Sequence, residues 1–311
     1  MRTILILITA LFILSLPASG QESLSKSQKK EQKKTQKHGQ KDEEEDPNPF
    51  PLRRVEFGLN FGAYFANKYS ANYYNGSPGN VNDLDFLMSN IYTYRQIKTA
   101  LGLSESDVIE IPADGYAMNM HYNVAFSGGL FVRINLNRKN SFFLQANYAQ
   151  LRAADVVSIK VNPTSYLSFD DIMLEPVIGT EGRVMIDLGY QRSFPLKSRI
   201  NLFIQGGVTM CYTQVIKSIF VAEGTEFNLI NIYGDNGQQP YNNQTFTVNQ
   251  NAFGFGGYLG AGVSIPLTDM FGLEPGFFTH YYPVNLQEYP DFKASFGLYL
   301  RILMFFGKTE E

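Results

Sequence analysis

The stretch Asp291–Glu311 reads DFKASFGLYLRILMFFGKTEE and decides the fold. Every second residue in it is apolar: Ala294, Phe296, Leu298, Leu300, Ile302, Met304 and Phe306. The alternate positions carry Lys293, Ser295, Gly297, Tyr299 and Arg301. Strict alternation predicts a β-strand with two unlike faces. An arginine opposite a wholly apolar face predicts lipid on one side of the strand and a polar interior on the other.

Seven other segments alternate in the same way, with large apolar residues on one face and small, polar or charged residues on the other. They are Val55 to Phe65, Tyr122 to Leu136, a segment that starts at Phe142, Arg183 to Gln191, Ile200 to Thr213, Gly254 to Ile265 and Phe271 to Tyr281. The segment from Phe142 loses its phase toward Asp155. The sequence therefore predicts eight strands, the third of them irregular at its upper end.

Long and short connections alternate between these segments. Roughly 50 residues join the first and second, roughly 20 the third and fourth, and roughly 35 the fifth and sixth, well beyond ordinary hairpin loops. Tight turns at 137–140, 195–198 and 268–270 lie between them. This pattern predicts an all-β fold, an eight-stranded antiparallel transmembrane β-barrel with long outer loops. A soluble barrel would bury the apolar face inside instead.

The two ends of the chain predict its location. Residues 1–20 hold Arg2, an apolar run and small residues before Gln21, the pattern of a secretory signal peptide. Residues 21–51 have almost no apolar side chain and predict a disordered, charged periplasmic linker. A tether whose lysines touch an anionic cell-wall polymer is the alternative. We assign residues 52–307 to the barrel, 308–311 to a C-terminal tail, and the protein to the outer membrane.

Composition argues against several classes of function. The chain has 311 residues and a formal net charge of −3, with 19 Tyr, 25 Phe and 27 Gly but no Trp. A charge so near zero argues against nucleic acid as a partner. The single cysteine, Cys211, cannot form an intrachain disulfide. The sequence FGKT at 306–309 lacks the preceding glycine of a phosphate loop, so we expect no cofactor.

Two parts of the sequence carry a resemblance to a known family. Residues 295–302, SFGLYLRI, resemble the signal of polar and hydrophobic residues around a glycine by which the outer-membrane assembly machinery recognises its clients. With the opening VEFGLNFGAYF at 55–65, Arg53 to Gly307 resembles the PorT-like outer-membrane β-barrel family of Bacteroidota. The resemblance implies the barrel fold and the outer membrane. Because some members resemble components of a protein-secretion system, it also implies secretion as one role.

Four charged residues fall on the predicted inward face, near the periplasmic ends of their strands: Glu56, Arg133, Glu274 and Arg301. Their strands are consecutive in a closed barrel, so we predict one lumen charge network. Eight strands leave a lumen just wide enough for side chains to fill, and charges buried there must be paired. We expect the network to plug the barrel, with gated ion conduction as the alternative.

The sequence gives weak support for catalysis or metal binding. His121 and His280 fall on the inward face near the outer end, and Ser127 has the same phase lower down. A hydrolase needs a nucleophile and an orienting acid beside its histidine, and two scattered histidines make a poor metal site. We expect lumen histidines bonded to Tyr64 or Tyr282, with no catalytic residue and no metal.

The outer loops are better candidates for function. In the first, Val81 to Leu103 predicts a short helix capped by Asn82. The third, residues 226–253, mixes Asn and Gln with aromatic residues, which suits protein or glycan contact. Loops that only cap the barrel are the alternative.

Taken with the barrel, these loops predict a non-enzymatic protein that contacts outer-membrane lipid. It would bind envelope or surface proteins through its outer loops or its periplasmic linker, as a scaffold component of an envelope assembly, with protein secretion as the specific case. An autonomous surface adhesin or ligand receptor is the alternative, and a narrow solute channel is less favoured.

Overall fold

The computed structural model of the chain describes residues 54–162, 171–196, 200–229, 251–286 and 289–305. The predicted signal peptide at 1–20, the linker at 21–51 and the tail at 308–311 lie outside these ranges, as does most of the third outer loop. Those assignments therefore stay predictions. Within the described ranges, no helix has the length and apolar character needed to cross a membrane.

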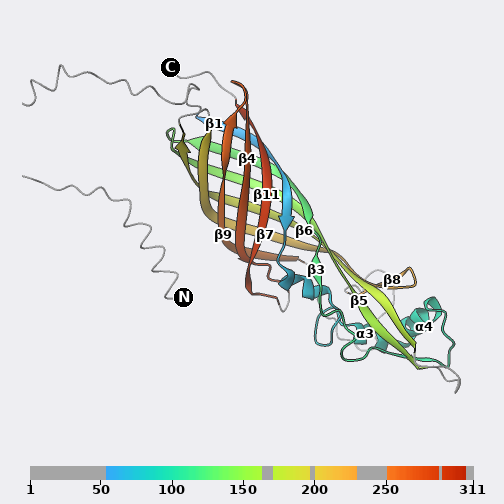
Figure 1. The fold of residues 1–311 in the computed structure, drawn as a ribbon. Helices are drawn as coiled ribbons and strands as arrows, with labels where there is room; N and C mark the ends of the chain where they lie inside the picture. The colour runs from blue at the N-terminus through green and yellow to red at the C-terminus, as the bar shows by residue number, and fades with distance from the viewer. Residues whose placement is uncertain (1–53, 163–170, 197–199, 230–250, 287–288, 306–311) are drawn as a thin grey trace, which may run out of the picture. The chain divides into compact units, whose positions relative to one another are not determined.

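Eight strands close into a ring, which confirms the predicted barrel. In chain order they are β1 (Val55–Phe65), β4 (Ala125–Asn135), β5 (Asn140–Asn162), β6 (Asp171–Pro195), β7 (Asn201–Ala222), β9 (Asn251–Pro266), β10 (Phe271–Pro283) and β11 (Phe292–Phe305). Each pairs antiparallel with the next in this order. The ring closes between β1 and β11, from Glu56 opposite Phe305 to Phe65 opposite Phe296 (Figure 1).

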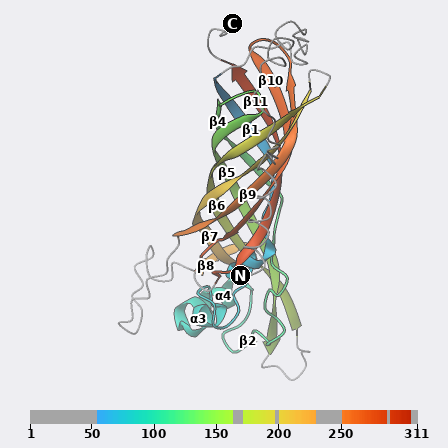
Figure 2. The same ribbon diagram turned by 90° about the vertical axis from the view of Figure 1, so that its left-hand side faces the viewer.

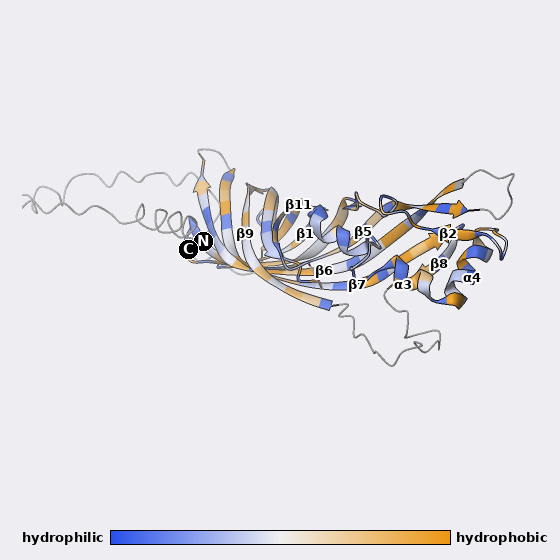
Figure 3. Ribbon diagram, turned by 90° about the horizontal axis from the view of Figure 1, so that it is seen from below, coloured by the Kyte–Doolittle hydropathy of each residue, from blue (hydrophilic) through white to orange (hydrophobic). Residues whose placement is uncertain are grey.

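Side chains on the strands alternate between the outer wall and the lumen. On β11, Phe296 and Leu298 are each 57 % exposed on the wall, whereas Arg301 is fully buried in the lumen. Figure 3 shows apolar and polar positions alternating along the strands. Exposed aromatic residues gather near the short-turn end (Phe57, Phe142, Tyr190, Phe194, Phe271) and near the long-loop end (Phe65, Phe253, Tyr281, Phe292). An apolar wall between two aromatic girdles is what a bilayer requires, and the short turns mark the periplasmic end.

The strands β5 and β6 run far beyond the barrel (Figure 1). They have 23 and 25 residues and pair without interruption from Asn140 opposite Arg192 to Val161 opposite Asp171. A tilted strand needs about 9 to 11 residues to cross a bilayer, so the outer half of this hairpin stands outside the membrane. The long connection predicted between the third and fourth strands is therefore mostly strand.

The expected loss of phase toward Asp155 is a change of face. Leu144 and Tyr148 are exposed on the outer wall, whereas farther along β5 the apolar residues Leu151, Ala153, Val157, Ile159 and Val161 point inward and are buried. Asp155 is a polar residue in this apolar row because its Oδ2 accepts a hydrogen bond from the Asn119 backbone over 2.9 Å. The strand thus stays regular while its apolar side changes, because beyond the membrane its inner face packs against the first outer loop.

The first outer loop folds against this hairpin. It contains the 3-10 helix η1 (Lys68–Tyr74), α3 (Leu84–Ser89), α4 (Ile91–Ala100) and two short strands, β2 (Val108–Glu110) and β3 (His121–Tyr122), which pair with β5. Figure 2 shows α3, α4 and β2 gathered at the same end of the barrel. On the other side of the hairpin, β8 (Thr225–Asn228) pairs with β7.

The single helix predicted over 81–103 is two helices, and Asn82 caps neither. Asp83 caps α3 and Asn90 caps α4, each through a side-chain oxygen that accepts backbone N–H bonds. Asn82 is instead fully buried, and its side-chain amide donates to the Tyr73 carbonyl. This hydrogen bond connects two parts of the first outer loop, at the position where the sequence predicted the start of a helix.

Candidate functional site

The four charged residues of the predicted lumen network come together near the periplasmic end. The Nε of Arg133 donates to Glu56 over 2.9 Å, and its Nη1 donates to Glu274 over 2.9 Å. The other oxygen of Glu274 accepts from Nη1 of Arg301, also over 2.9 Å. Glu274 and Arg301 are fully buried, and Glu56 and Arg133 are 8 % and 6 % exposed. Each charge therefore has an opposite neighbour in a space with little water.

Amide side chains complete the hydrogen bonding of these guanidiniums. Arg301 donates from Nε to Asn60 Oδ1 over 2.8 Å and from Nη2 to Gln145 Oε1 over 2.9 Å. Arg133 donates from Nη1 to Gln191 Oε1 over 3.1 Å. A guanidinium carries five N–H groups, and a buried one needs several acceptors. The network is thus a filled cross-section of the lumen, built from six strands.

Aromatic rings fill the lumen beyond this network. The rings of Phe131 and Phe143 stack with centroids 6.0 Å apart, and those of Tyr258 and Phe278 with centroids 6.2 Å apart. Gly297 makes room for this layer, because a Cβ there would lie 2.2 Å from Cζ of Phe278. Side chains therefore occupy the lumen here, as expected for eight strands.

Only one of the two histidines lies in the lumen. His280 is 1 % exposed, with its Nε2 2.9 Å from Oδ1 of Asp187, and Oδ2 of Asp187 accepts from Gln145 over 2.8 Å. The expected bonds from His280 to the neighbouring tyrosines are replaced by this carboxylate. Sequence alternation places Asp187 on the inward face of the fourth segment. It does not predict that His280 of β10 lies beside it.

The predicted inward position of His121 is wrong. This histidine is exposed, and its Nδ1 lies 3.0 Å from the backbone oxygen of Asn119. The reason is that β4 begins only at Ala125, while His121 belongs to β3, a separate strand on the outer part of β5. Ser127 is buried in the lumen. Within the described ranges, no group of three or more His, Cys, Asp or Glu side chains is placed to hold a metal ion.

A second charged network, which the sequence did not reveal, lies at the outer mouth. Glu181 and Arg183 are fully buried on β6 and form an ion pair over 2.6 Å. The hydroxyls of Tyr74 and Tyr122 donate to Glu181 over 2.6 and 3.0 Å, and Arg183 donates to the Ser70 hydroxyl over 2.9 Å. Because Ser70 and Tyr74 belong to η1, this network fastens the loop helix in the mouth of the barrel.

Outside the barrel, the first outer loop and the outer parts of β5, β6, β7 and β8 form a folded unit, which we call the platform (residues 66–124, 150–162, 171–182 and 215–229). Its core includes Leu84, Leu87, Ile97, Leu101 and Ile109 from the loop and Val157 and Ile159 from β5. Large apolar side chains are also exposed on it: Ile91, Tyr92, Met118, Ile172 and Leu174, each at least half exposed. They lie on α4, in the loop before β3 and on β6, and are candidates for contact with another molecule.

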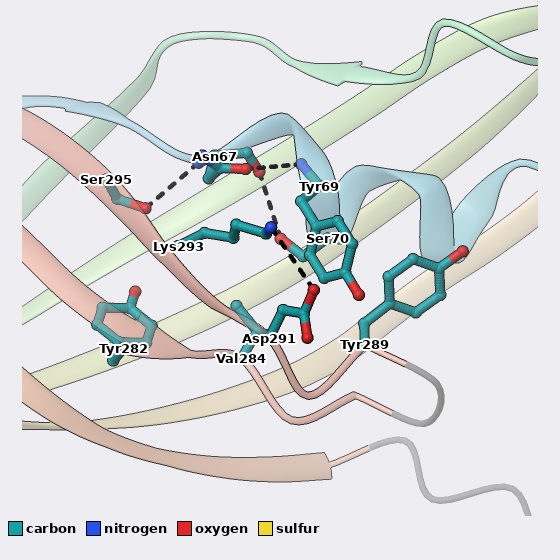
Figure 4. A pocket seen from close by; sticks show the side chains of 9 residues that line it. All are labelled: Asn67, Tyr69, Ser70, Tyr282, Val284, Tyr289, Asp291, Lys293 and Ser295. Atoms are coloured by element: carbon teal, nitrogen blue, oxygen red, sulfur yellow. Dashed lines mark hydrogen bonds and ion pairs between the residues drawn. The ribbon is translucent and has the colours of Figure 1, made fainter. Parts of the chain in front are cut away.

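A small hollow lies where the platform meets β10 and β11 (Figure 4). Asn67 donates from its backbone to the Ser295 hydroxyl over 3.3 Å, and Nζ of Lys293 lies 3.5 Å from Asp291 and 4.5 Å from the centroid of the Tyr69 ring. Burial and the nearby Asp291 carboxylate raise the pKa of the Tyr69 phenol. The hollow measures about 10 Å³, room for about one water. It is a packed joint and not a ligand site.

A larger cavity, of about 320 Å³, opens in the platform between α3 and the β2–β5 pair. Its floor includes Ile109 and Ile159, and Met88 forms part of its wall. At the rim the Tyr116 hydroxyl donates to Asp85 over 2.5 Å, and burial together with this carboxylate raises the pKa of the Tyr116 phenol. Polar residues such as Asp85 and Glu110 make up about half of the lining, so the cavity is a candidate for a small ligand that offers both polar and apolar groups.

No protein-family model matches the chain, and no curated protein matches it in sequence. Solved structures similar to it include Neisserial surface protein A (TM-score 0.34, 10 % identity, 81 % of this chain and 96 % of that chain). Others are the outer membrane protein OprG from Pseudomonas aeruginosa (0.33, 9 %, 83 % and 95 %) and Ail, the attachment invasion locus protein of Yersinia pestis (0.30, 9 %, 82 % and 99 %). These TM-scores and identities are too low to support an argument, so the barrel is assigned from the strand pairing of this chain alone. With its closed antiparallel ring and apolar wall, the chain is an eight-stranded β-barrel of the outer membrane.

Proposed function

We propose that the protein is a non-enzymatic binding or scaffold barrel, whose platform contacts other envelope or surface proteins. The observation that carries the proposal is the uninterrupted pairing of β5 with β6 from the barrel wall into the platform. A binding surface gains affinity when it is held in place before its partner arrives. Exposed Met118 and Leu174, at 73 % and 63 %, offer the apolar contacts that such a surface uses.

The filled lumen argues against a solute channel. Two charged networks and an aromatic layer occupy it in succession, and their main members, Glu274, Arg301, Glu181 and Arg183, are fully buried. Barrels that carry an aqueous channel have more strands than eight. We therefore propose that the lumen charges hold the barrel shut and rigid.

The surroundings of His280 argue against an enzyme. A general base must lie within hydrogen-bond reach of its substrate, but this imidazole is 1 % exposed and its Nε2 faces Asp187. The rings of Tyr258 and Phe278 lie 5.3 and 4.9 Å from it, centroid to centroid. These side chains leave the imidazole no access to a substrate.

Membership of a secretion or surface-attachment assembly is the specific form of this proposal. It is supported by the resemblance of Arg53 to Gly307 to PorT-like barrels and by the presence of two separate candidate contact regions, the platform and the charged segment at 21–51. A ligand receptor is the second candidate, and the cavity of about 320 Å³ beside Tyr116 favours it.

The test is affinity purification from gently solubilised outer membranes, with partners identified by mass spectrometry. One variant replaces residues 155–177 by an Asn-Gly turn, because Ala154 and Ile178 face each other and this dipeptide closes a two-residue hairpin. A second variant lacks residues 21–48 and keeps the platform. We expect partners of the parent to be lost with the platform and retained without the linker segment.

The two variants also separate the alternatives. Loss of partners only with residues 21–48 would move the contact to the periplasmic side. If the parent captures no protein, and binding of a small ligand disappears with Met88→Trp, which fills the cavity, the receptor is the better description. A parent without protein partners or ligand would contradict the proposal.

A further inference from the structure

The outer wall of the barrel has a furrow along β9, on the side that faces the bilayer. Its floor is formed by small side chains and bare backbone at Ala261, Gly262, Val263, Pro275 and Gly276, and its walls are Phe194, Leu202, Ile204 and Phe277. The hollow measures about 490 Å³, and every side chain that lines it is apolar. We call this hollow the β9 furrow.

The strand register explains why the wall is hollow here. In one row across the sheet Ile204 of β7 faces Ala261 of β9, and Ala261 faces Phe277 of β10. Ile204 and Phe277 are 53 % and 59 % exposed. These two large side chains therefore project from the wall on either side of the small Ala261 methyl group. The next row has Leu202 opposite Val263 on β7 and β9. A groove between ridges therefore runs along β9 over consecutive outward positions.

A break in the β9–β10 ladder lies at the same place. The two strands pair at Ile265 opposite Leu273 and again at Gly262 opposite Gly276, but not at the two positions between. Pro275 stands in that gap, and a proline has no N–H to donate to a neighbouring strand. Proline is unusual inside a sheet. The β9–β10 ladder is thus interrupted at the floor of the β9 furrow.

We propose that the β9 furrow is a binding site for one acyl chain of a phospholipid in the periplasmic leaflet. The furrow lies in the lower half of the wall, four residues along β10 from Phe271 of the periplasmic girdle. Hydrocarbon is the medium at that depth, and a hollow without polar groups does not hold water. A chain in the furrow touches protein on three sides, whereas chains elsewhere on the wall touch it on one, so dispersion contacts hold it longer.

The absence of tryptophan from the sequence allows a direct test. Phe277→Trp places a single reporter on the furrow wall, and Phe296→Trp places one on β11, at a similarly exposed wall position away from the furrow. Both variants are refolded in vesicles of phosphatidylethanolamine and phosphatidylglycerol that carry bromine on the acyl chains. They are then exchanged into detergent, and quenching of tryptophan emission is followed. We expect F277W to stay quenched after the exchange and F296W to recover at once.

A filled furrow gives the matched comparison. Ala261→Phe in the F277W background closes the hollow and is expected to abolish the residual quenching. Ala146→Phe adds the same ring at an outward position of β5 and is expected to leave it unchanged. Recovery of F277W as fast as F296W would overturn the proposal. Quenching that persists after Ala261→Phe would also overturn it. So would quenching of F277W that remains only in samples that light scattering shows to be dimers, since a second copy of the chain would then occupy the furrow.

Discussion

At the scale of single residues, Glu274 is the group on which the lumen network depends most. Its two oxygens each hold a guanidinium over 2.9 Å, Arg133 from β4 and Arg301 from β11. Without that carboxylate, two buried positive charges would lie near each other in a space of low dielectric. Sequence alternation placed all four members of this network on the inward face, because period two fixes the face of every strand residue.

Glu274→Gln is expected to lower the free energy of unfolding by about 3 to 5 kcal/mol, since it keeps the size of the side chain and removes the charge that pairs two buried groups. Urea unfolding of the barrel refolded in vesicles, followed by circular dichroism, measures it. The control is Glu226→Gln, which breaks an exposed pair with Lys217 and is expected to cost less than about 1 kcal/mol. Similar costs for both variants would mean that the lumen network adds no more than a surface pair.

Gly179 decides how η1 sits in the outer mouth. A Cβ at this position would lie 2.1 Å from Cγ of Tyr74. Gly179→Ala is therefore expected to displace the Tyr74 ring, loosen the first outer loop and speed trypsin cleavage after exposed Arg95. The control is Gly128→Ala, whose Cβ meets no atom closer than 3.6 Å. Cleavage of G179A at the parent rate would show that the loop is held by other contacts.

At the scale of elements, the sequence predicted the strands, which have a regular hydrophobic period. It did not predict the features that depend on helix caps or on contacts with residues distant in the sequence. All eight strands were found because each alternates, but the apolar residues of β5 change face between exposed Tyr148 and buried Leu151, where the strand leaves the barrel. Glu181 was missed as a network member because its partners Tyr74 and Tyr122 come from a loop whose path no periodicity gives. The start of α4 was missed because Asn90 ends one helix and begins the next.

Asn90→Ala is expected to weaken the platform locally by about 1 kcal/mol, because its side chain accepts the backbone N–H groups of Tyr92 and Thr93 at the start of α4. Hydrogen exchange of α4 amides, read by mass spectrometry, measures the change. Asn90→Asp caps a helix equally well and serves as the control. The barrel strands should exchange at the parent rate in both variants, and faster exchange there would mean that the platform and the barrel unfold together.

At the scale of the whole molecule, the lumen is closed at several levels. The periplasmic network, the aromatic layer and the outer network follow one another between the short turns and η1. A closed ring with a filled interior combines the stability of a barrel with the absence of a pore. In the described ranges, buried side chains therefore fill the lumen from the periplasmic network to the outer mouth.

In planar bilayers the parent protein is expected to show no steady conductance, because no continuous water path crosses three filled layers. A porin of more strands in the same bilayer is the positive control. A large, stable open state of the parent would contradict the proposed plug. Removing η1 alone is expected to leave the protein closed, since the periplasmic network and the aromatic rings remain.

The barrel is also expected to migrate as a compact band in cold detergent gels and to shift on boiling, because a closed ring has no free edge from which unfolding can begin. The shift should persist when residues 155–177 are replaced by a turn, since the barrel part of each strand remains. A variant that no longer shifts would show that the platform is required for the barrel to close.

The continuous pairing of β5 with β6 has a mechanical consequence. A partner that pulls on the platform pulls both strands along their length. The load then passes to β4, which pairs with β5 from Ser127 opposite Ala149 to Asn135 opposite Ser141. It also passes to β7, which pairs with β6 from Val177 opposite Phe220 to Pro195 opposite Asn201. Hydrogen bonds between strands lie across this direction, so they are sheared together instead of being opened one after another. The geometry resists tension along the strands, which is the load that the proposed attachment at a cell surface would impose.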